Sequence, residues 1–224
     1  MNLPFRTFLE AQTAAGGFTT DDAIRVFLPL ARQVLLVHRS GLVAPLQYAS
    51  SIVAVDGCLG FDPSSAAPPT RNDDRLRALE RPWRAAVEII GQVETQDDLD
   101  AGTFRRRSMD VATGSQSSLE RPVYLPGYSV WELQVGHHDP LSDMHLLGLI
   151  LASLACGIDL HEAEAMRDWV EHRRNPFVRW PALHPVVAQA IHRLTELDRL
   201  RREPDLAAVI ASLENYREQT VDLE

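Results

Sequence analysis

Residues 142–151, SDMHLLGLIL, decide the fold of this chain. After a polar start the segment is apolar on every side, and a helix that is apolar all round is buried rather than packed along one stripe. It is shorter than the ~20 apolar residues that span a bilayer. Ser142 is a suitable N-cap, and Asp143 places a negative charge in the first turn, where the helix dipole favours it. We therefore predict the buried central helix of a mainly helical globular core.

Amphipathic helices are predicted on both sides of this central helix, because apolar residues recur there at helical spacing. Gly16 and Gly17 end the first of them. Thr19 and Asp22 form a capping-box-like start for the second, in which Pro29 is expected to produce a kink. The predicted helices cover residues 5–15, 19–40, 161–174, 184–199 and 205–217.

Two short apolar runs, at residues 52–55 and 58–61, flank Asp56 and Gly57. An Asp-Gly pair between such runs favours a type I′ turn, which needs a positive φ at both central positions. A β-hairpin is therefore predicted here. The residues after it, 63–71, are rich in Pro, Ser and Ala and are predicted to form a loop.

Residues 64–121 are predicted to form an insert in the domain. Within it, a helical turn is expected over Asp73–Leu79, and the apolar stretches Val87–Val93 and Phe104–Val111 are predicted to pair as strands. No internal repeat or long linker divides the chain. We predict one domain over residues 1–224, mainly α (α+β), with a small β-hairpin and a β insert.

The composition excludes several classes of function. The formal net charge of −9 at pH 7 argues against a protein that binds nucleic acid or an anionic membrane, because both need a basic surface. Cys58 and Cys156 do not form a C-x-x-C pair, and buried free thiols indicate a reducing compartment. No basic segment leads into an apolar run after Met1, so we expect no secretory signal and a cytoplasmic location.

Several strings resemble the C-terminal lobe (C-lobe) of protein kinases, in particular of bacterial Ser/Thr kinases. The central helix is similar to the S-D-x-[YW]-S-L-G-x-x-L helix of that lobe. Four further strings also resemble motifs of the family. GFTTDDA at 17–23 is similar to G-x-L-S-x-E-E-A, and VHRSGLV at 37–43 to L-H-x-x-G-I-V. PVYLP at 122–126 is similar to P-x-Y-M-x-P, and RREPDL at 201–206 to R-R-P-x-x-L. The resemblance covers residues 5–62 and 122–217 and implies a C-lobe-like helical domain.

The same resemblance implies that kinase chemistry is lost. Phosphoryl transfer needs an Asp that accepts the hydroxyl proton, an Asn and a second Asp that hold magnesium, and an N-terminal lobe (N-lobe) that clamps ATP. The family's H-R-D-L-K-P-x-N falls on APLQYASS, which places Leu46 at the base, Tyr48 at the lysine and Ser51 at the Asn. Asp62 lies near the second Asp, but no Phe-Gly follows it. With no N-lobe sequence before the first helix, we expect an inactive pseudokinase without a cofactor.

Two further residues align with conserved acids of kinases. The acid of the family's A-P-E motif aligns with Tyr128. Asp143 matches the acid of the central helix, which in kinases accepts hydrogen bonds from the backbone of the catalytic loop. Asp143 is therefore expected to be a structural anchor rather than a chemical group.

A C-lobe without an N-lobe leaves its upper side bare, and this side is predicted to expose a partly apolar face. The residues that form it are Leu46, Tyr48, Ile52 and Phe61. Exposed apolar patches of this kind are usually interaction sites. Either residues 72–121 fold back over the face or another chain packs there. We predict a scaffold or regulatory domain in signalling, whose upper face binds a protein partner or a second copy.

A different class of function is a metal-dependent phosphohydrolase with an all-helical fold. His137, His138 and Asp139, followed by His145, offer imidazoles and a carboxylate within a short span. Such enzymes hydrolyse phosphate esters through metal-bound water and need further ligands on separate helices. The other histidines and aspartates of the chain complete no recognisable ligand spacing. The alternative interpretation of the cluster is a polar loop that leads into the buried helix.

Overall fold

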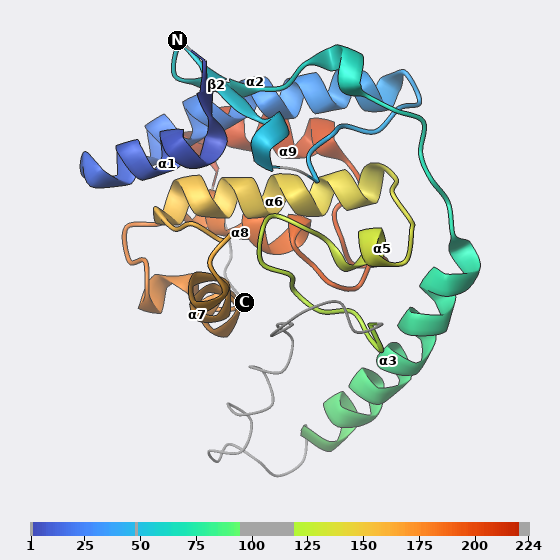
Figure 1. Cartoon of the computed structure of the whole chain (residues 1–224). Coiled ribbons are helices and arrows are strands. Elements are labelled where there is room, and N and C mark those ends of the chain that lie inside the picture. The colour runs from blue at the N-terminus through green and yellow to red at the C-terminus, as the bar shows by residue number, and fades with distance from the viewer. Residues whose placement is uncertain (1, 48, 95–118, 220–224) are drawn as a thin grey trace.

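Helix α6 (Pro140–Cys156) runs through the middle of the molecule in the computed structural model, which describes residues 2–47, 49–94 and 119–219 (Figure 1). All its residues from Ser142 to Leu154 are buried, as the sequence predicts. The N-cap, however, is Asp139 and not Ser142: Asp139 Oδ1 accepts the Ser142 N–H at 3.1 Å, and Pro140 occupies the first helical position. The helix ends at Gly157, whose φ of 66° is left-handed.

The remaining helices pack around α6, with α2 and α8 in the most extensive contact with it. The α-helices are α1 (Phe5–Ala14), α2 (Thr20–Arg39), α3 (Asp73–Glu94), α5 (Trp131–Gln134), α7 (Ala163–His172), α8 (Pro185–Leu194) and α9 (Leu206–Glu214). Short 3-10 turns are η1 (Ala49–Ser51), η2 (Pro63–Ser65), η4 (Pro176–Val178) and η5 (Tyr216–Glu218). The mainly helical class predicted from the sequence is therefore confirmed.

The small β element is a three-stranded antiparallel sheet in the order β1 (Leu3–Pro4), β2 (Val53–Val55) and β3 (Cys58–Gly60). Asp56 and Gly57 have φ values of 51° and 78°, so the predicted Asp-Gly hairpin is confirmed. The sequence did not indicate β1, because two residues carry no pattern. This strand brings the N-terminal segment against the hairpin and extends the sheet by one strand.

The predicted strand at Val87–Val93 is wrong, because these residues belong to the long helix α3. Asp73 and Asp74 lie in its first turn, where the helix dipole favours acidic residues. Leu76 and Trp83, seven residues apart, pack against the core at helical spacing. Helix α3 runs along the outer edge of the molecule (Figure 1). The other predicted strand, Phe104–Val111, lies outside the described residues.

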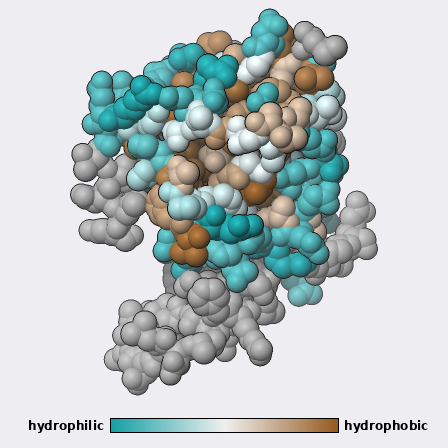
Figure 2. All heavy atoms as spheres, turned by 90° about the vertical axis from the view of Figure 1, so that its left-hand side faces the viewer, coloured by the Kyte–Doolittle hydropathy of each residue, from teal (hydrophilic) through white to brown (hydrophobic). Residues whose placement is uncertain are grey.

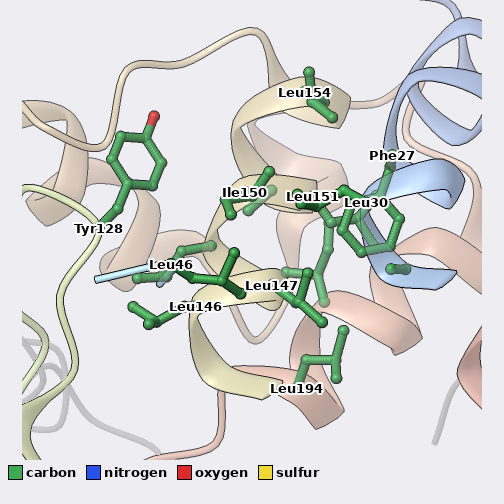
Figure 3. Packing of buried hydrophobic residues seen from close by; sticks show 14 of the residues in the cluster. Phe27, Leu30, Leu46, Tyr128, Leu146, Leu147, Ile150, Leu151, Leu154 and Leu194 are labelled. Atoms are coloured by element: carbon green, nitrogen blue, oxygen red, sulfur yellow. The ribbon is translucent and has the colours of Figure 1, made fainter. Parts of the chain in front are cut away.

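Leucine and isoleucine side chains of α6 fill the centre of the core and meet α2 on one side and α8 on the other (Figure 3). Gly148 allows α6 and α8 to approach closely. A Cβ atom at this position would lie 2.6 Å from Thr195 Cγ2 and 2.7 Å from Leu194 Cβ. Both distances are shorter than real carbon contacts, so a side chain at residue 148 would push the two helices apart.

Replacing Gly148 by alanine is expected to lower the free energy of unfolding by about 2 kcal/mol, although alanine is the better helix former. The reason is overpacking against α8. Chemical denaturation of the wild type and the variant measures this loss. In a Thr195→Ser background, which removes the nearer methyl group, part of the loss should be recovered. A Gly148→Ala variant as stable as the wild type would contradict the close approach.

Candidate functional site

Asp143 of α6 is a fully buried acid, and its carboxylate joins three separate segments of the chain. Its Oδ2 accepts the backbone N–H of Ala44 at 2.8 Å and lies 2.8 Å from His38 Nε2. Its Oδ1 lies 2.7 Å from His138 Nε2. We call these four residues the Asp143 cluster.

Each member of the Asp143 cluster is positioned by a different element. His38 lies in the last turn of α2, Ala44 follows that helix, and Asp143 lies in the first turn of α6. His138 precedes α6 and is held by an isolated antiparallel bridge to Thr70, with N–H to carbonyl distances of 2.7 and 2.9 Å. The backbone contact to Ala44 is of the kind expected of Asp143 as a structural anchor.

The positions that align with kinase catalytic residues do not form a catalytic group. Leu46 is fully buried in the hydrophobic core. Ser51 ends the η1 turn, and Tyr48 lies outside the described residues. Asp62 caps the η2 turn: its Oδ1 accepts the Ser64 N–H at 2.9 Å, and this bond lowers the pKa of the exposed carboxyl. Among the aligned positions that the structure describes, none brings together an acid that faces a base.

The predicted exposed face is wrong, because Leu46, Ile52 and Phe61 are at most 5% exposed. The N-terminal segment covers this side: Phe5 donates its N–H to the Ile52 carbonyl at 3.0 Å and packs edge-on against Tyr128. Tyr48, the fourth predicted member, lies outside the described residues. The side that was expected to be bare is thus part of the core of the same chain.

The predicted metal cluster is not assembled either. His138 is bonded to Asp143, whereas His137 Nε2 lies 3.1 Å from Asp139 Oδ2. His145 stacks on Tyr124 in the core, where burial and then the nearby positive charge of Arg202 lower its pKa. Within the described ranges no group of three or more His, Cys, Asp or Glu side chains could hold a metal ion.

A second buried network, which the sequence did not indicate, surrounds Glu132 of α5. Glu132 is fully buried and its Oε1 lies 2.9 Å from Arg199 Nη1 and 2.5 Å from Arg202 Nη1. Arg199 also reaches Asp139 at 2.5 Å. Burial alone would raise the pKa of Asp139, but the charge of Arg199 and the hydrogen bonds from His137, Arg199 and Ser142 together hold that pKa at about 2. We call these four residues the Glu132 network.

The Glu132 network accounts for one difference from the sequence predictions. Helix α8 ends at Leu194, earlier than predicted, and the chain that follows it turns so that Arg199 and Arg202 reach Glu132. The buried acid in this region is Glu132 and not the aligned position Tyr128. Tyr128 has a left-handed φ of 54°, and its hydroxyl group lies 2.8 Å from Ser153 Oγ.

An open groove of about 640 Å³ runs along α2. One wall is a stripe of that helix, and the opposite wall is residues 213–218, at the end of α9 and in η5. The stripe consists of Asp21, Ile24, Arg25, Leu28, Pro29 and Arg32. Two ion pairs join the walls, Arg32 with Glu214 at 2.6 Å and Asp21 with Arg217. We call this feature the α2 groove; no sequence motif pointed to it.

The surface at the C-terminal end of α6 has hydrophobic residues near its middle and hydrophilic ones around them (Figure 2). Ala155, Cys156 and Ile158, at this end of α6, are partly buried against the core. Burial raises the pKa of the Cys156 thiol to about 12, so it stays protonated and unreactive near neutral pH. Neither Cys156 nor Cys58 is in a disulfide.

No protein-family model, curated protein or solved structure matches this chain. Among the described helices, none combines the length and apolar character needed to cross a membrane. The geometry alone therefore distinguishes three features: the Asp143 cluster and the Glu132 network, which are internal, and the α2 groove, which is open to solvent.

Replacing Asp143 by alanine is expected to lower the free energy of unfolding by about 3 kcal/mol or more, because it leaves the Ala44 N–H and two imidazoles without their acceptor. Denaturant titration measures the change. Asp205→Ala is the matched control: Asp205 is an exposed N-cap that accepts the Ala208 N–H at 3.0 Å, and its loss should cost about 1 kcal/mol. Equal losses in the two variants would contradict the anchoring role of Asp143.

Proposed function

We propose that this protein is a catalytically inactive domain, similar to a protein-kinase C-lobe, that binds a protein partner. The observation that carries the proposal is the state of the buried carboxylate of Asp143. Both carboxylate oxygens of Asp143 are occupied by groups of the same chain, namely Ala44, His38 and His138. A carboxylate whose acceptor sites are filled by its own fold serves to hold segments together and is not free to act on a substrate.

The aligned catalytic positions support the same proposal. A general base must accept a proton within hydrogen-bond reach of the reacting group. Leu46, at the aligned position of the base, has only a hydrocarbon side chain and lies in the core. Asp62 uses its carboxylate to cap a turn. Phosphoryl transfer depends on positioning and on charge stabilisation, and these residues supply neither.

The α2 groove is the surface that we propose for the partner, in place of the buried upper side. Protein interfaces combine an apolar centre with a polar, solvent-accessible rim. Ile24, Leu28 and Pro29 are the apolar residues of the α2 stripe, and the charged Asp21 and Arg32 stand at its two ends. From Asp21 to Arg32 the stripe extends over about 16 Å, at ~1.5 Å per helical residue. That length suits a short peptide segment of another protein.

We propose that the protein acts in the cytoplasm. Cys58 and Cys156 are both free thiols, and Cys156 is largely shielded from solvent. Free cysteines of this kind are typical of a reducing compartment.

The absence of nucleotide chemistry is tested by thermal unfolding with and without ATP and magnesium. We expect an unchanged melting temperature at millimolar ATP, because the aligned positions offer no metal ligand or phosphate clamp. A nucleotide present at 100 times its Kd would add about 2.7 kcal/mol, a shift that is easily measured. An active kinase serves as the positive control. Stabilisation by ATP and magnesium, or transfer of phosphate to a peptide, would contradict the proposal.

The groove is tested by charge reversal at two exposed arginines. Arg25 lines the α2 groove, whereas Arg167 lies on α7, outside it. Arg25→Glu is expected to weaken binding of the partner about tenfold, while Arg167→Glu leaves binding unchanged. The partner is first identified as the protein that co-purifies with the wild type, and its Kd is then measured by calorimetry with purified components. Wild-type affinity in Arg25→Glu would exclude the groove as the binding surface.

A further inference from the structure

His137 is a buried histidine with both ring nitrogens engaged, and it belongs to neither buried cluster. It is 3% exposed. Its Nδ1 accepts the backbone N–H of Asn72 at 3.1 Å, so this nitrogen carries no proton. The other nitrogen, Nε2, therefore bears the hydrogen, and it lies 3.1 Å from Asp139 Oδ2. The ring is thus fixed as one neutral tautomer by the bonds at its two ends.

The bond from Asn72 to His137 attaches the start of α3 to the body of the molecule. Asn72 immediately precedes α3, and its side-chain amide also donates to the Val135 carbonyl at 2.8 Å. Two residues earlier, Thr70 pairs with His138. Farther along α3, Arg84 forms an ion pair with Asp198 at 2.9 Å. Of these attachments, only the bond from the Asn72 N–H involves the His137 side chain.

We infer that His137 is a pH-dependent latch for the N-terminal end of α3. As a neutral imidazole it accepts the Asn72 N–H and so holds the start of α3 against the body of the molecule. Protonation places a hydrogen on Nδ1, which can then no longer accept that N–H. The new N–H then forms an ion pair with the carboxylate of Asp73, whose Oδ1 lies 3.7 Å from Nδ1. Acidification therefore exchanges a backbone bond for an ion pair and loosens the chain around Asn72.

The charges around His137 allow this exchange. Asp73 on α3 and Asp139 before α6 both face the ring with their carboxylates. Arg199, from the segment after α8, contacts Asp139. Glu132 of α5 accepts the His137 backbone N–H through its carbonyl, while its carboxylate is bound to Arg199. Because the pKa of Asp139 is about 2, Asp139 stays ionised near pH 5 and above, so only the Nδ1 end changes partner.

The test is amide hydrogen exchange measured by NMR on the full chain at about pH 8 and about pH 5. Rates are corrected for the intrinsic effect of pH on exchange. We expect the protection of the Asn72 amide to fall about five- to tenfold at the lower pH, which corresponds to the loss of one hydrogen bond. The amide of Leu147, inside α6, should keep its protection and so exclude global unfolding. Imidazole nitrogen shifts should show the Nε2–H tautomer of His137 at pH 8.

Two variants separate the latch from other effects of acid. In His137→Gln the side chain does not titrate, so the protection of Asn72 should be the same at both pH values. In Asp73→Asn, a change at a side chain 53% exposed, Asn72 should be protected as in the wild type at pH 8 and should lose its protection only at lower pH. Protection of Asn72 that does not change with pH in the wild type, or that falls equally in His137→Gln, would overturn the proposal.

Discussion

The structure depends on a buried carboxylate in the first turn of a helix that is otherwise surrounded by hydrocarbon. An ionised group in such a place is tolerated only when hydrogen-bond donors fill its oxygens. Asp143 obtains those donors from three separate segments, at His38, Ala44 and His138. The apolar residues of α6 require burial, and Asp143 fixes which segments can bury them. Packing and polar satisfaction therefore specify the same arrangement.

The Glu132 network is a second group of buried charges and serves another part of the molecule. Glu132 and Arg202 are both buried, and Arg202 also donates to the Leu141 carbonyl at 2.9 Å. The network thus connects α5, the start of α6 and the segment between α8 and α9. A buried ion pair contributes little net stability against an apolar replacement, but removing one partner leaves an uncompensated charge in the core. Such a network mainly specifies one arrangement among several apolar packings.

The sequence allowed the central helix and the hairpin to be predicted because both have short-range signals. Residues 142–151 are apolar on every side, and Asp56-Gly57 separates two apolar runs. The N-cap Asp139 also has a local signal, the Pro140 that follows it at the first helical position. In α3, the apolar residues from 87 to 93 suggested a strand, although the acidic start of the segment favours a helix.

The remaining features come from contacts between distant residues, for which a single sequence gives no signal. Glu132 and Arg202 meet across 70 positions, and neither has a local pattern that indicates its partner. The cover over Ile52 includes β1 and Phe5 at the N-terminal end of the chain, and a strand of two residues is too short to detect in a sequence. The inference of an exposed face rested on a resemblance to a larger fold. Here the chain covers that side with its own N-terminal segment.

The stretch from residue 137 to 139 shows why a cluster of metal-binding residue types can be structural. Three consecutive side chains point to three different elements. His137 contacts the start of α3, His138 contacts Asp143 in α6, and Asp139 contacts Arg199 after α8. A metal site requires such side chains to converge on one point, whereas these diverge. The two buried clusters meet at this stretch, because His138 belongs to the Asp143 cluster and Asp139 to the Glu132 network.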